Sequence, residues 1–279
     1  VKEAARTAGA TGTLAVCNGD ILTNVDLTSM IARHRETGAT LSISLAPVDD
    51  PWSYGVATVD DDLRIAHFVE KPLRDEEPSN LVNAGTWLWE PAVLARIPDD
   101  NSAARDGFSE RVLFPGIIAD GLRVQGFTED LWVDVGAPDR YFRATRLLLE
   151  REAQRRGRSL LVADGAQVAP GAEFIGNVMV GAGARIERGA RIIGPSVIGE
   201  RATVEAGATI EDSVLWEDAH AGAGATVRGS IIAAGASVGE RASVVDAILA
   251  DGARVPDGVA LDPGARLMPN EVAGAAQAT

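Results

Sequence analysis

The chain has 279 residues, of which 46% are hydrophobic and 24% are charged, and its formal net charge is −14. That length accommodates one large or two ordinary domains. The acidic balance argues against binding to a nucleic-acid backbone, and no apolar run is long enough for a membrane span. The single cysteine, Cys17, excludes a disulfide framework, and no signal-peptide core is apparent. We therefore expect a soluble, cytoplasmic protein without nucleic-acid or membrane partners.

Short apolar runs alternate with amphipathic segments through the first half of the chain. Strands are predicted at 13–17, 40–48, 56–59, 64–69 and 83–90, and near 123–127 and 131–135. Helices are predicted at 25–38 and 91–97, at 109–121 in two pieces around Pro115, and from 138 to a stop at Gly157. Interleaved strands and helices favour an α/β fold with a mostly parallel sheet covered on both faces. Ligands in such sheets bind at the carboxyl ends of the strands.

The second half has a different period. Apolar residues recur every six positions, with three steps of five, at Val168, Phe174, Val180, Ile186, Ile192, Ile198, Val204, Ile210, Leu215, Ala221, Val227, Ile232, Val238, Val244, Leu249, Val255, Leu261 and Leu267. Two residues before each one stands Ala or Ser, except at Val178 and Val259. Three residues before, Gly, Asn or Asp predominates, and these residues tolerate left-handed backbone.

A period of six fits neither a helix nor a long alternating strand, but it fits a triangular solenoid with one short strand and one corner per unit. The alternative is a disordered Gly/Ala segment, which would not keep branched aliphatic residues in phase. The pattern resembles the hexapeptide-repeat, left-handed parallel β-helix, and the hand is implied by that resemblance. We expect a sheet domain over 1–157, the β-helix over 158–272, and a frayed tail over 273–279.

Six short motifs in the first half follow one another in an order that resembles a known family. They are NGD (18–20), Tyr54-Gly55, FVEKP (68–72), NAG (83–85), SERVLFP (109–115) and WVDVGAPDRY (132–141). Followed by hexapeptide repeats, they resemble the sugar-nucleotide pyrophosphorylases, most of all the mannose-1-phosphate guanylyltransferases. The resemblance implies a partial Rossmann-like, mixed or parallel sheet of the GT-A-like nucleotidyltransferase type.

The reaction implied by the resemblance joins a sugar 1-phosphate to a nucleoside triphosphate and releases pyrophosphate. Two anionic reactants must meet, so the reaction calls for a divalent cation, and Mg²⁺ takes one or two carboxylates plus substrate phosphates. Asp20 and Asp134 are the candidate catalytic metal ligands, although each could be an ordinary turn or cap residue. Lys71, one of two lysines beside 24 arginines, is expected to offset the charge of the sugar phosphate, against the alternative of a solvated surface charge.

Further residues are implied to contact the substrates. Glu70 is expected to accept hydrogen bonds from sugar hydroxyls, the alternative being a surface ion pair with Lys71. The remaining expected contacts could each equally be turn residues, namely Gly19, Gly55, Asn83 and Gly85. His34, His67 and Cys17 are expected to be structural.

The printed sequence departs from the family pattern in one respect: it contains no glycine-rich GxGTR-like segment. We therefore expect an N-terminally truncated form that by itself binds nucleoside triphosphate poorly and turns over little or not at all. Two alternatives stay open, a non-catalytic scaffold subunit and a hexapeptide acyltransferase, for which His220 is the single histidine in the repeats. The flat, repetitive sides of a β-helix also suggest a homo-oligomer. The nucleobase and the sugar cannot be assigned from these residues.

Overall fold

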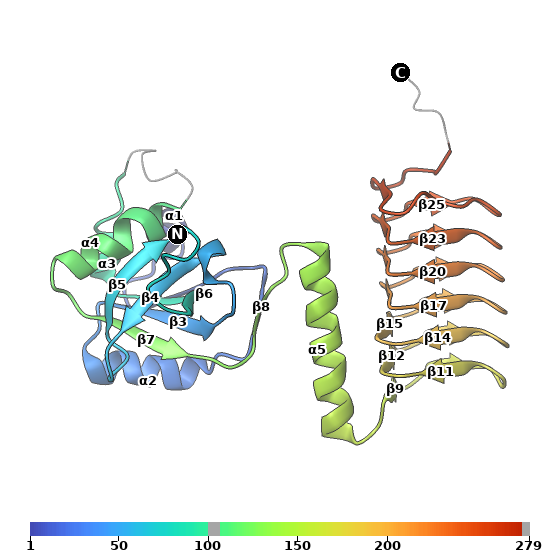
Figure 1. Ribbon diagram of the computed structural model, residues 1–279, viewed down its shortest axis with the longest axis horizontal. Coiled ribbons are helices and arrows are strands. Elements are labelled where there is room, and N and C mark those ends of the chain that lie inside the picture. The colour runs from blue at the N-terminus through green and yellow to red at the C-terminus, as the bar shows by residue number, and fades with distance from the viewer. Residues whose placement is uncertain (100–106, 275–279) are drawn as a thin grey trace. The chain divides into compact units, whose positions relative to one another are not determined.

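A computed structural model describes residues 1–99 and 107–274 (Figure 1). The chain packs into two compact units, Val1–Tyr141 and Phe142–Thr279. The division falls within helix α5 (Pro138–Arg156), so the expected domain limits at 157 and 158 stay a prediction. Most of the expected tail, 275–279, lies outside the described residues. None of the helices in the described ranges is long and apolar enough to cross a membrane.

The first unit contains a six-stranded mixed sheet with β6 (Leu81–Trp89) at its centre. One edge of β6 pairs with β3 (Leu41–Pro47), and the other pairs with β1 (Leu14–Cys17) and β4 (Gly55–Val59). The outer strands are β5 (Ile65–Glu70), next to β4, and β7 (Val124–Thr128), next to β3.

Most of these pairs are antiparallel, and β3 with β7 is the parallel one. The expectation of a mostly parallel sheet is therefore wrong. Parallel neighbours need long crossover connections, whereas β4 and β5 are joined by the short Asp60–Asp62 turn and form a hairpin. The hairpin itself is as predicted.

Short helices accompany this sheet: α1 (Lys2–Thr7), α2 (Leu27–Thr37), α3 (Pro91–Leu94) and α4 (Phe114–Ala119), with a 3₁₀ turn η1 (Pro51–Ser53) and a π-helical turn η3 (Ser109–Leu113). Helix α2 forms where the sequence predicts a helix, and both of its ends are capped. The Asp26 carboxylate accepts hydrogen bonds from two backbone N–H groups of the first turn, and Gly38 ends the helix at φ 62°.

A second, two-stranded antiparallel ribbon consists of β2 (Ile21–Thr23) and β8 (Trp132–Asp134), with Ile21 opposite Asp134. Strand β2 was not predicted. The Asp20 carbonyl accepts a hydrogen bond of 2.8 Å from the backbone N–H of Val135. The pairing brings two segments more than a hundred residues apart in sequence to one place.

The second unit is a parallel β-solenoid with three sheets (Figure 1). The first sheet contains β10 (Gln167–Val168), β13 (Arg185–Ile186), β16 (Thr203–Val204), β19 (His220–Ala221), β22 (Ser237–Val238) and β25 (Arg254–Val255). The second contains β11 (Glu173–Ile175), β14 (Arg191–Ile193), β17 (Thr209–Glu211), β20 (Thr226–Arg228) and β23 (Ser243–Val245). The third contains β9 (Leu160–Val162), β12 (Val178–Val180), β15 (Ser196–Ile198), β18 (Val214–Leu215), β21 (Ile231–Ile232), β24 (Ile248–Leu249) and β26 (Arg266–Leu267).

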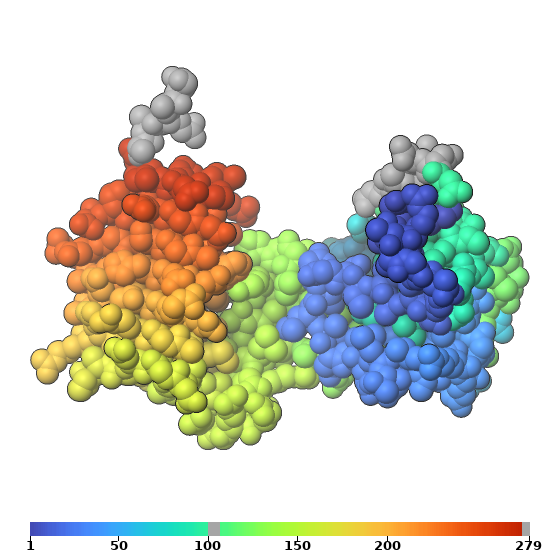
Figure 2. Space-filling view, turned by 180° about the vertical axis from the view of Figure 1, so that it is seen from behind, coloured from blue at the N-terminus to red at the C-terminus, as the bar shows by residue number. Residues whose placement is uncertain are grey.

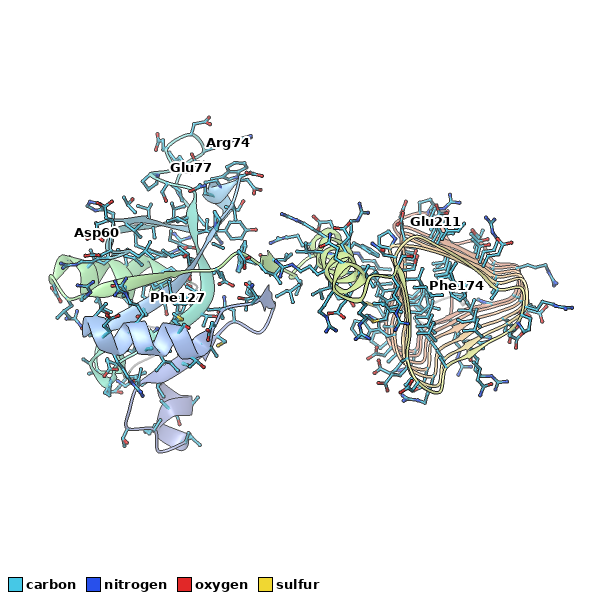
Figure 3. The ribbon with its side chains drawn as sticks, turned by 90° about the horizontal axis from the view of Figure 1, so that it is seen from below. Asp60, Arg74, Glu77, Phe127, Phe174 and Glu211 are labelled. Carbon is cyan, nitrogen blue, oxygen red and sulfur yellow. The ribbon has the colours of Figure 1, made fainter. Side chains whose placement is uncertain are left out.

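The apolar residue of each unit points into the coil, as the period predicted. From Val180 to Val255 these side chains are at most 2% exposed. Figure 3 shows the three-sided cross-section of the solenoid. The labelled Phe174 packs against the buried apolar residues inside it. Figure 2 shows the successive coils as layers from yellow to red. No coil closes its own core, so stacking creates it.

The corners of the solenoid adopt left-handed backbone even where the residue at the corner disfavours that conformation. The residue three before each interior position has positive φ except at Asn177 and Pro195. Arg201 and Arg241, which broke the Gly/Asn/Asp pattern, adopt φ 56° and 52° at the same corner. The Arg201 guanidinium donates two hydrogen bonds of 2.8 Å to the carboxylate of Asp218, the corner residue of the next coil. The geometry of the coil therefore overrides residue preference.

Each five-residue step coincides with a buried column of serines. The hydroxyls of Ser196, Ser213 and Ser230 accept the backbone N–H groups of Ser213, Ser230 and Ala247, at 3.2, 3.1 and 3.0 Å. The three serine residues are fully buried. A hydroxyl thus takes the place of a carbonyl acceptor where the corner is one residue shorter.

The burial of equivalent repeat positions predicts unequal stability effects. Val204→Ala removes two methyl groups from a side chain that is 0% exposed, and we expect it to lower the free energy of unfolding by about 2 kcal/mol. Val168→Ala is the matched control on the same sheet, because Val168 is 40% exposed, and its cost should stay below about 0.5 kcal/mol. Urea denaturation followed by circular dichroism measures both; equal losses would contradict the interior assignment.

Candidate functional site

A cleft of about 300 Å³ opens in the first unit at the ribbon β2–β8 and the adjoining ends of β4, β5 and β6. It is lined by Asn18, Asp20, Ile21, Ser53, Tyr54, Gly55, Glu70, Lys71, Asn83, Glu110, Trp132, Asp134 and Arg140. The structure thus brings together six of the residues expected from the sequence: Asp20, Gly55, Glu70, Lys71, Asn83 and Asp134. Gly19 and Gly85 do not line the cleft.

The carboxylates of Asp20 and Asp134 face the same point. Oδ2 of Asp20 lies 3.4 Å, and Oδ1 of Asp134 3.1 Å, from the position that a Cβ on Gly136 would take. Asp134 Oδ1 accepts a hydrogen bond of 2.8 Å from the Gly136 N–H, which orients it. Within the described ranges the Asp20 carboxylate is exposed and accepts no hydrogen bond. Gly136 leaves open the space between the two carboxylates.

This pair fits a magnesium ion that has few protein ligands. Mg²⁺ binds oxygen at about 2.1 Å and usually keeps water and substrate phosphates in its remaining positions. Among the described residues, no group of three or more His, Cys, Asp and Glu side chains could hold a metal on its own. Asp20 and Asp134 could therefore hold the ion together with an anionic ligand. A closed structural metal site needs more protein ligands than this.

Lys71 stands at the end of β5 in an uncommon backbone conformation. Its φ is 49°, and its backbone N–H donates a 3.0 Å hydrogen bond to the Tyr54 carbonyl. Non-glycine residues held in the left-handed region cluster at functional sites. The ammonium lies 4.0 Å from Oε1 of Glu70, which is too long for a direct hydrogen bond, and the Lys71 side chain is 56% exposed. The ammonium therefore remains accessible to an anion in the cleft.

Gly55, Gly85 and Asn83 make room for or orient side chains at the cleft. A Cβ on Gly55 would come within 2.5 Å of the Phe68 ring and 2.7 Å of Glu70 Oε2, so Gly55 makes room for the glutamate. Gly85 has φ 78°, and a Cβ there would meet the Asn18 side chain at 2.8 Å. Asn83 Oδ1 accepts hydrogen bonds from Gly85 N–H and from Trp87 Nε1. Its NH₂ group forms no hydrogen bond with any residue of 1–99 or 107–274, and it can therefore donate to a ligand.

Sequence reasoning missed Tyr54, Trp132 and Arg140 as side chains of the cleft. The Arg140 guanidinium forms an ion pair with Oδ2 of Asp134, and its Nη1 lies 3.4 Å from the Tyr54 hydroxyl. The Tyr54 ring meets Trp132 edge to face at 5.0 Å. Burial raises the pKa of Tyr54 above its ordinary value. One signal was available: Arg140 lies in the first turn of α5, where the helix dipole disfavours a cation.

Two histidines form pairs with acidic residues, but neither pair is a catalytic constellation. His34 lies between Ser42, 2.8 Å from Nδ1, and Glu90, 3.1 Å from Nε2. His34 is 2% and Ser42 is 1% exposed, so the serine cannot meet a substrate. His220 Nε2 lies 2.8 Å from Glu205 in a shallow hollow of the solenoid. Cys17, expected to lie inertly within its strand, is exposed at the edge of the sheet.

Two family models match this chain. The model of the nucleotidyl transferase family matches residues 1–151, which is more than half of the chain. The chain belongs to the nucleotidyl transferase family. A second model, that of the GMPPB C-terminal domain, matches residues 160–275, the part that forms the solenoid.

Similar curated proteins act on sugar phosphates, according to their names. A mannose-1-phosphate guanylyltransferase of Mycobacterium tuberculosis is 36% identical over 60% of this chain and 47% of its own length. A UTP–glucose-1-phosphate uridylyltransferase of Synechocystis is 35% identical over 57% of this chain and 39% of its own. A probable mannose-1-phosphate guanylyltransferase of Oryza sativa is 32% identical over 59% of this chain and 42% of its own length. The chain spans about half the length of the curated relatives it matches.

Proposed function

We propose that this chain is a sugar-1-phosphate nucleotidylyltransferase, and that its substrates are mannose 1-phosphate and GTP. The product would be GDP-mannose with release of pyrophosphate. The observation that carries the proposal is the cleft itself, in which two facing carboxylates and an accessible lysine line one hollow of about 300 Å³. The family and the names of the relatives support the reaction class. We place the enzyme in the cytoplasm as a homo-oligomer assembled through the solenoid.

Each residue of the cleft has a role in this proposal. Asp20 and Asp134 hold Mg²⁺, which when bound neutralises phosphate charge. Lys71 contacts the phosphate of the sugar 1-phosphate and keeps its attacking oxygen in line with the α-phosphorus of the nucleotide. Glu70 accepts hydrogen bonds from sugar hydroxyls, and the Asn83 NH₂ group donates one. Positioning and charge neutralisation account for the catalysis, because phosphoryl-type transfer needs little covalent help from the protein.

Binding of the sugar phosphate tests the proposal directly. With Mn²⁺ present, isothermal titration calorimetry should show mannose 1-phosphate binding, and Lys71→Gln should weaken it about tenfold by removing a charge-assisted contact. Lys2→Gln is the matched control, because Lys2 is the other lysine and bonds to Ile97 and Asp99 instead. Absence of binding, or equal binding by both variants, would refute the assignment.

Turnover separates the enzyme from a non-catalytic scaffold subunit. The assay supplies a glycine-rich GxGTR-like segment in trans, because the printed sequence contains none and poor binding of nucleoside triphosphate is expected without it. With that segment present, we expect pyrophosphate release with mannose 1-phosphate and GTP to exceed release with glucose 1-phosphate and the other nucleoside triphosphates. Sugar-phosphate binding without release of pyrophosphate in any mixture would favour the scaffold.

Light scattering tests the proposed homo-oligomer, and a monomer in solution would contradict it.

A further inference from the structure

The ion pair between Arg140 and Asp134 lies at the candidate metal position. Arg140 contacts Oδ2 of Asp134, while the other oxygen of that carboxylate, Oδ1, faces Asp20. A cation bound between the two aspartates would share the Asp134 charge with the guanidinium. Because one carboxylate cannot fully neutralise two cations, the guanidinium and the metal compete.

The position of Arg140 is unfavourable for stability alone. It is the third residue of α5, in the first turn, where the positive end of the helix dipole repels a cation. Its side chain is 39% exposed, and ion pairs at that exposure contribute little to folding. The contact with Asp134 and the approach to Tyr54 nevertheless direct the guanidinium into the cleft. The arrangement is therefore better explained by a ligand than by the fold.

Arg140 and Lys71 are the basic side chains that line the cleft, which also contains Asp20, Glu70, Glu110 and Asp134. A phosphate dianion needs more positive charge than one lysine supplies, and a guanidinium matches phosphate oxygens in a two-pronged geometry. Movement of Arg140 from Asp134 to a phosphate would supply that contact. The same movement would free the Asp134 carboxylate for the metal.

We propose that Arg140 is a positioning residue that alternates between Asp134 and the phosphate of the sugar 1-phosphate. This inference rests on the proposed function. Without substrate it pairs with Asp134 and weakens metal binding. With substrate it binds the phosphate, so metal and sugar phosphate strengthen each other's binding. By linkage this coupling is reciprocal.

The test is a pair of calorimetric titrations on Arg140→Gln, and the two are expected to change in opposite directions. Mn²⁺ alone should bind the variant about fivefold more tightly than the wild type, because its competitor is gone. Mannose 1-phosphate, titrated with Mn²⁺ present, should bind about tenfold more weakly. Arg143→Gln removes an exposed arginine of the same helix and should change neither affinity. Arg140→Lys keeps the charge but not the two-pronged geometry, so its phosphate affinity should lie between those of Arg140→Gln and the wild type.

Unchanged affinities in Arg140→Gln, or a parallel loss of both, would overturn the inference. An unchanged thermal midpoint excludes misfolding; if the midpoint falls, the comparison rests on Arg140→Lys against the wild type. Sugar-phosphate binding by the wild type with no effect of Arg140 would refute the inference and leave the proposed function standing. Tighter Mn²⁺ binding by Arg140→Gln, with no binding of mannose 1-phosphate or glucose 1-phosphate to the wild type, would refute the function and support the competition at Asp134.

Discussion

Asp20→Asn is expected to lower the affinity for Mn²⁺ about a hundredfold while leaving the fold intact, because a metal-bound carboxylate supplies charge that an amide lacks. The Asp20 carboxylate is exposed and accepts no hydrogen bond within the described part of the chain, so we expect the fold to tolerate the loss of its charge. The amide keeps the size of the side chain. Paramagnetic broadening of water protons by Mn²⁺ measures the affinity without requiring turnover.

Asp139→Asn is the matched control for this prediction. Asp139 is an exposed aspartate five residues after Asp134 and does not line the cleft. It removes the same charge from the same region, so a general electrostatic effect would appear in both variants. Equal losses of affinity, or none in Asp20→Asn, would remove Asp20 from the metal site.

The second large effect concerns Glu129, which is 8% exposed at the base of the ribbon β2–β8. Its Oε2 accepts a hydrogen bond from the hydroxyl of Thr23, the last residue of β2. Its backbone N–H donates a hydrogen bond of 3.0 Å to the Leu45 carbonyl. Burial raises the pKa of Glu129 from 4.5 to about 7. The protonated glutamate thereby links the ribbon that carries Asp20 to the main sheet.

The sign of the pH effect follows from this pKa. The folded state holds the proton more tightly than the unfolded state, so the stabilising contribution is full below pH 4.5 and is lost as pH rises through about 7. Between pH 5 and pH 8 the loss is about 2 to 3 kcal/mol. Glu129→Gln cannot ionise, so its free energy of unfolding should rise relative to wild type by that amount over the same interval.

Urea denaturation at both pH values measures the difference, with the exposed Glu150→Gln on α5 as control. Comparing variants at each pH cancels the contribution of other titrating groups. A wild-type to Glu129→Gln difference that is the same at pH 5 and pH 8 would show that Glu129 is ionised throughout.

The solenoid could be predicted from the sequence because each repeat unit contacts its neighbours in the same way. The interior position of a coil is fixed by local periodicity, and the left-handed corner is fixed three residues earlier, even at Arg201 and Arg241. The handedness of the coil has no such local signal and was inferred by resemblance. The exposure of Val168 was not predictable either, because the pattern does not show where a stack of coils ends.

The sheet was predicted less completely. Its strands and the β4–β5 hairpin follow from local pattern, but strand direction depends on partners distant in sequence. Strand β2 is three residues long and exists through pairing with β8, which no local pattern indicates. This pairing brings Asp20 beside Asp134, so the expected meeting of the two carboxylates occurs on a separate ribbon and not at the ends of parallel strands.

The residues of the candidate site were predicted from the resemblance to a family, and some of them do not line the cleft. Asp20, Lys71 and Asp134 converge on the cleft, whereas Gly85 supports the packing of Asn18 and does not line it. Arg140 was missed because a residue in a helix first turn is read as part of the helix. The direction of the Arg140 side chain depends on its ion pair with Asp134, and this contact forms only in the tertiary structure.

A crystal of this chain with Mn²⁺ and mannose 1-phosphate, measured at a wavelength where manganese scatters anomalously, tests the central claim most directly. We predict one anomalous peak about 2.2 Å from carboxylate oxygens of both Asp20 and Asp134, with a phosphate oxygen as a further ligand and Lys71 beside the phosphate. A peak bound elsewhere, or sugar phosphate in the cleft without manganese at the two aspartates, would contradict it.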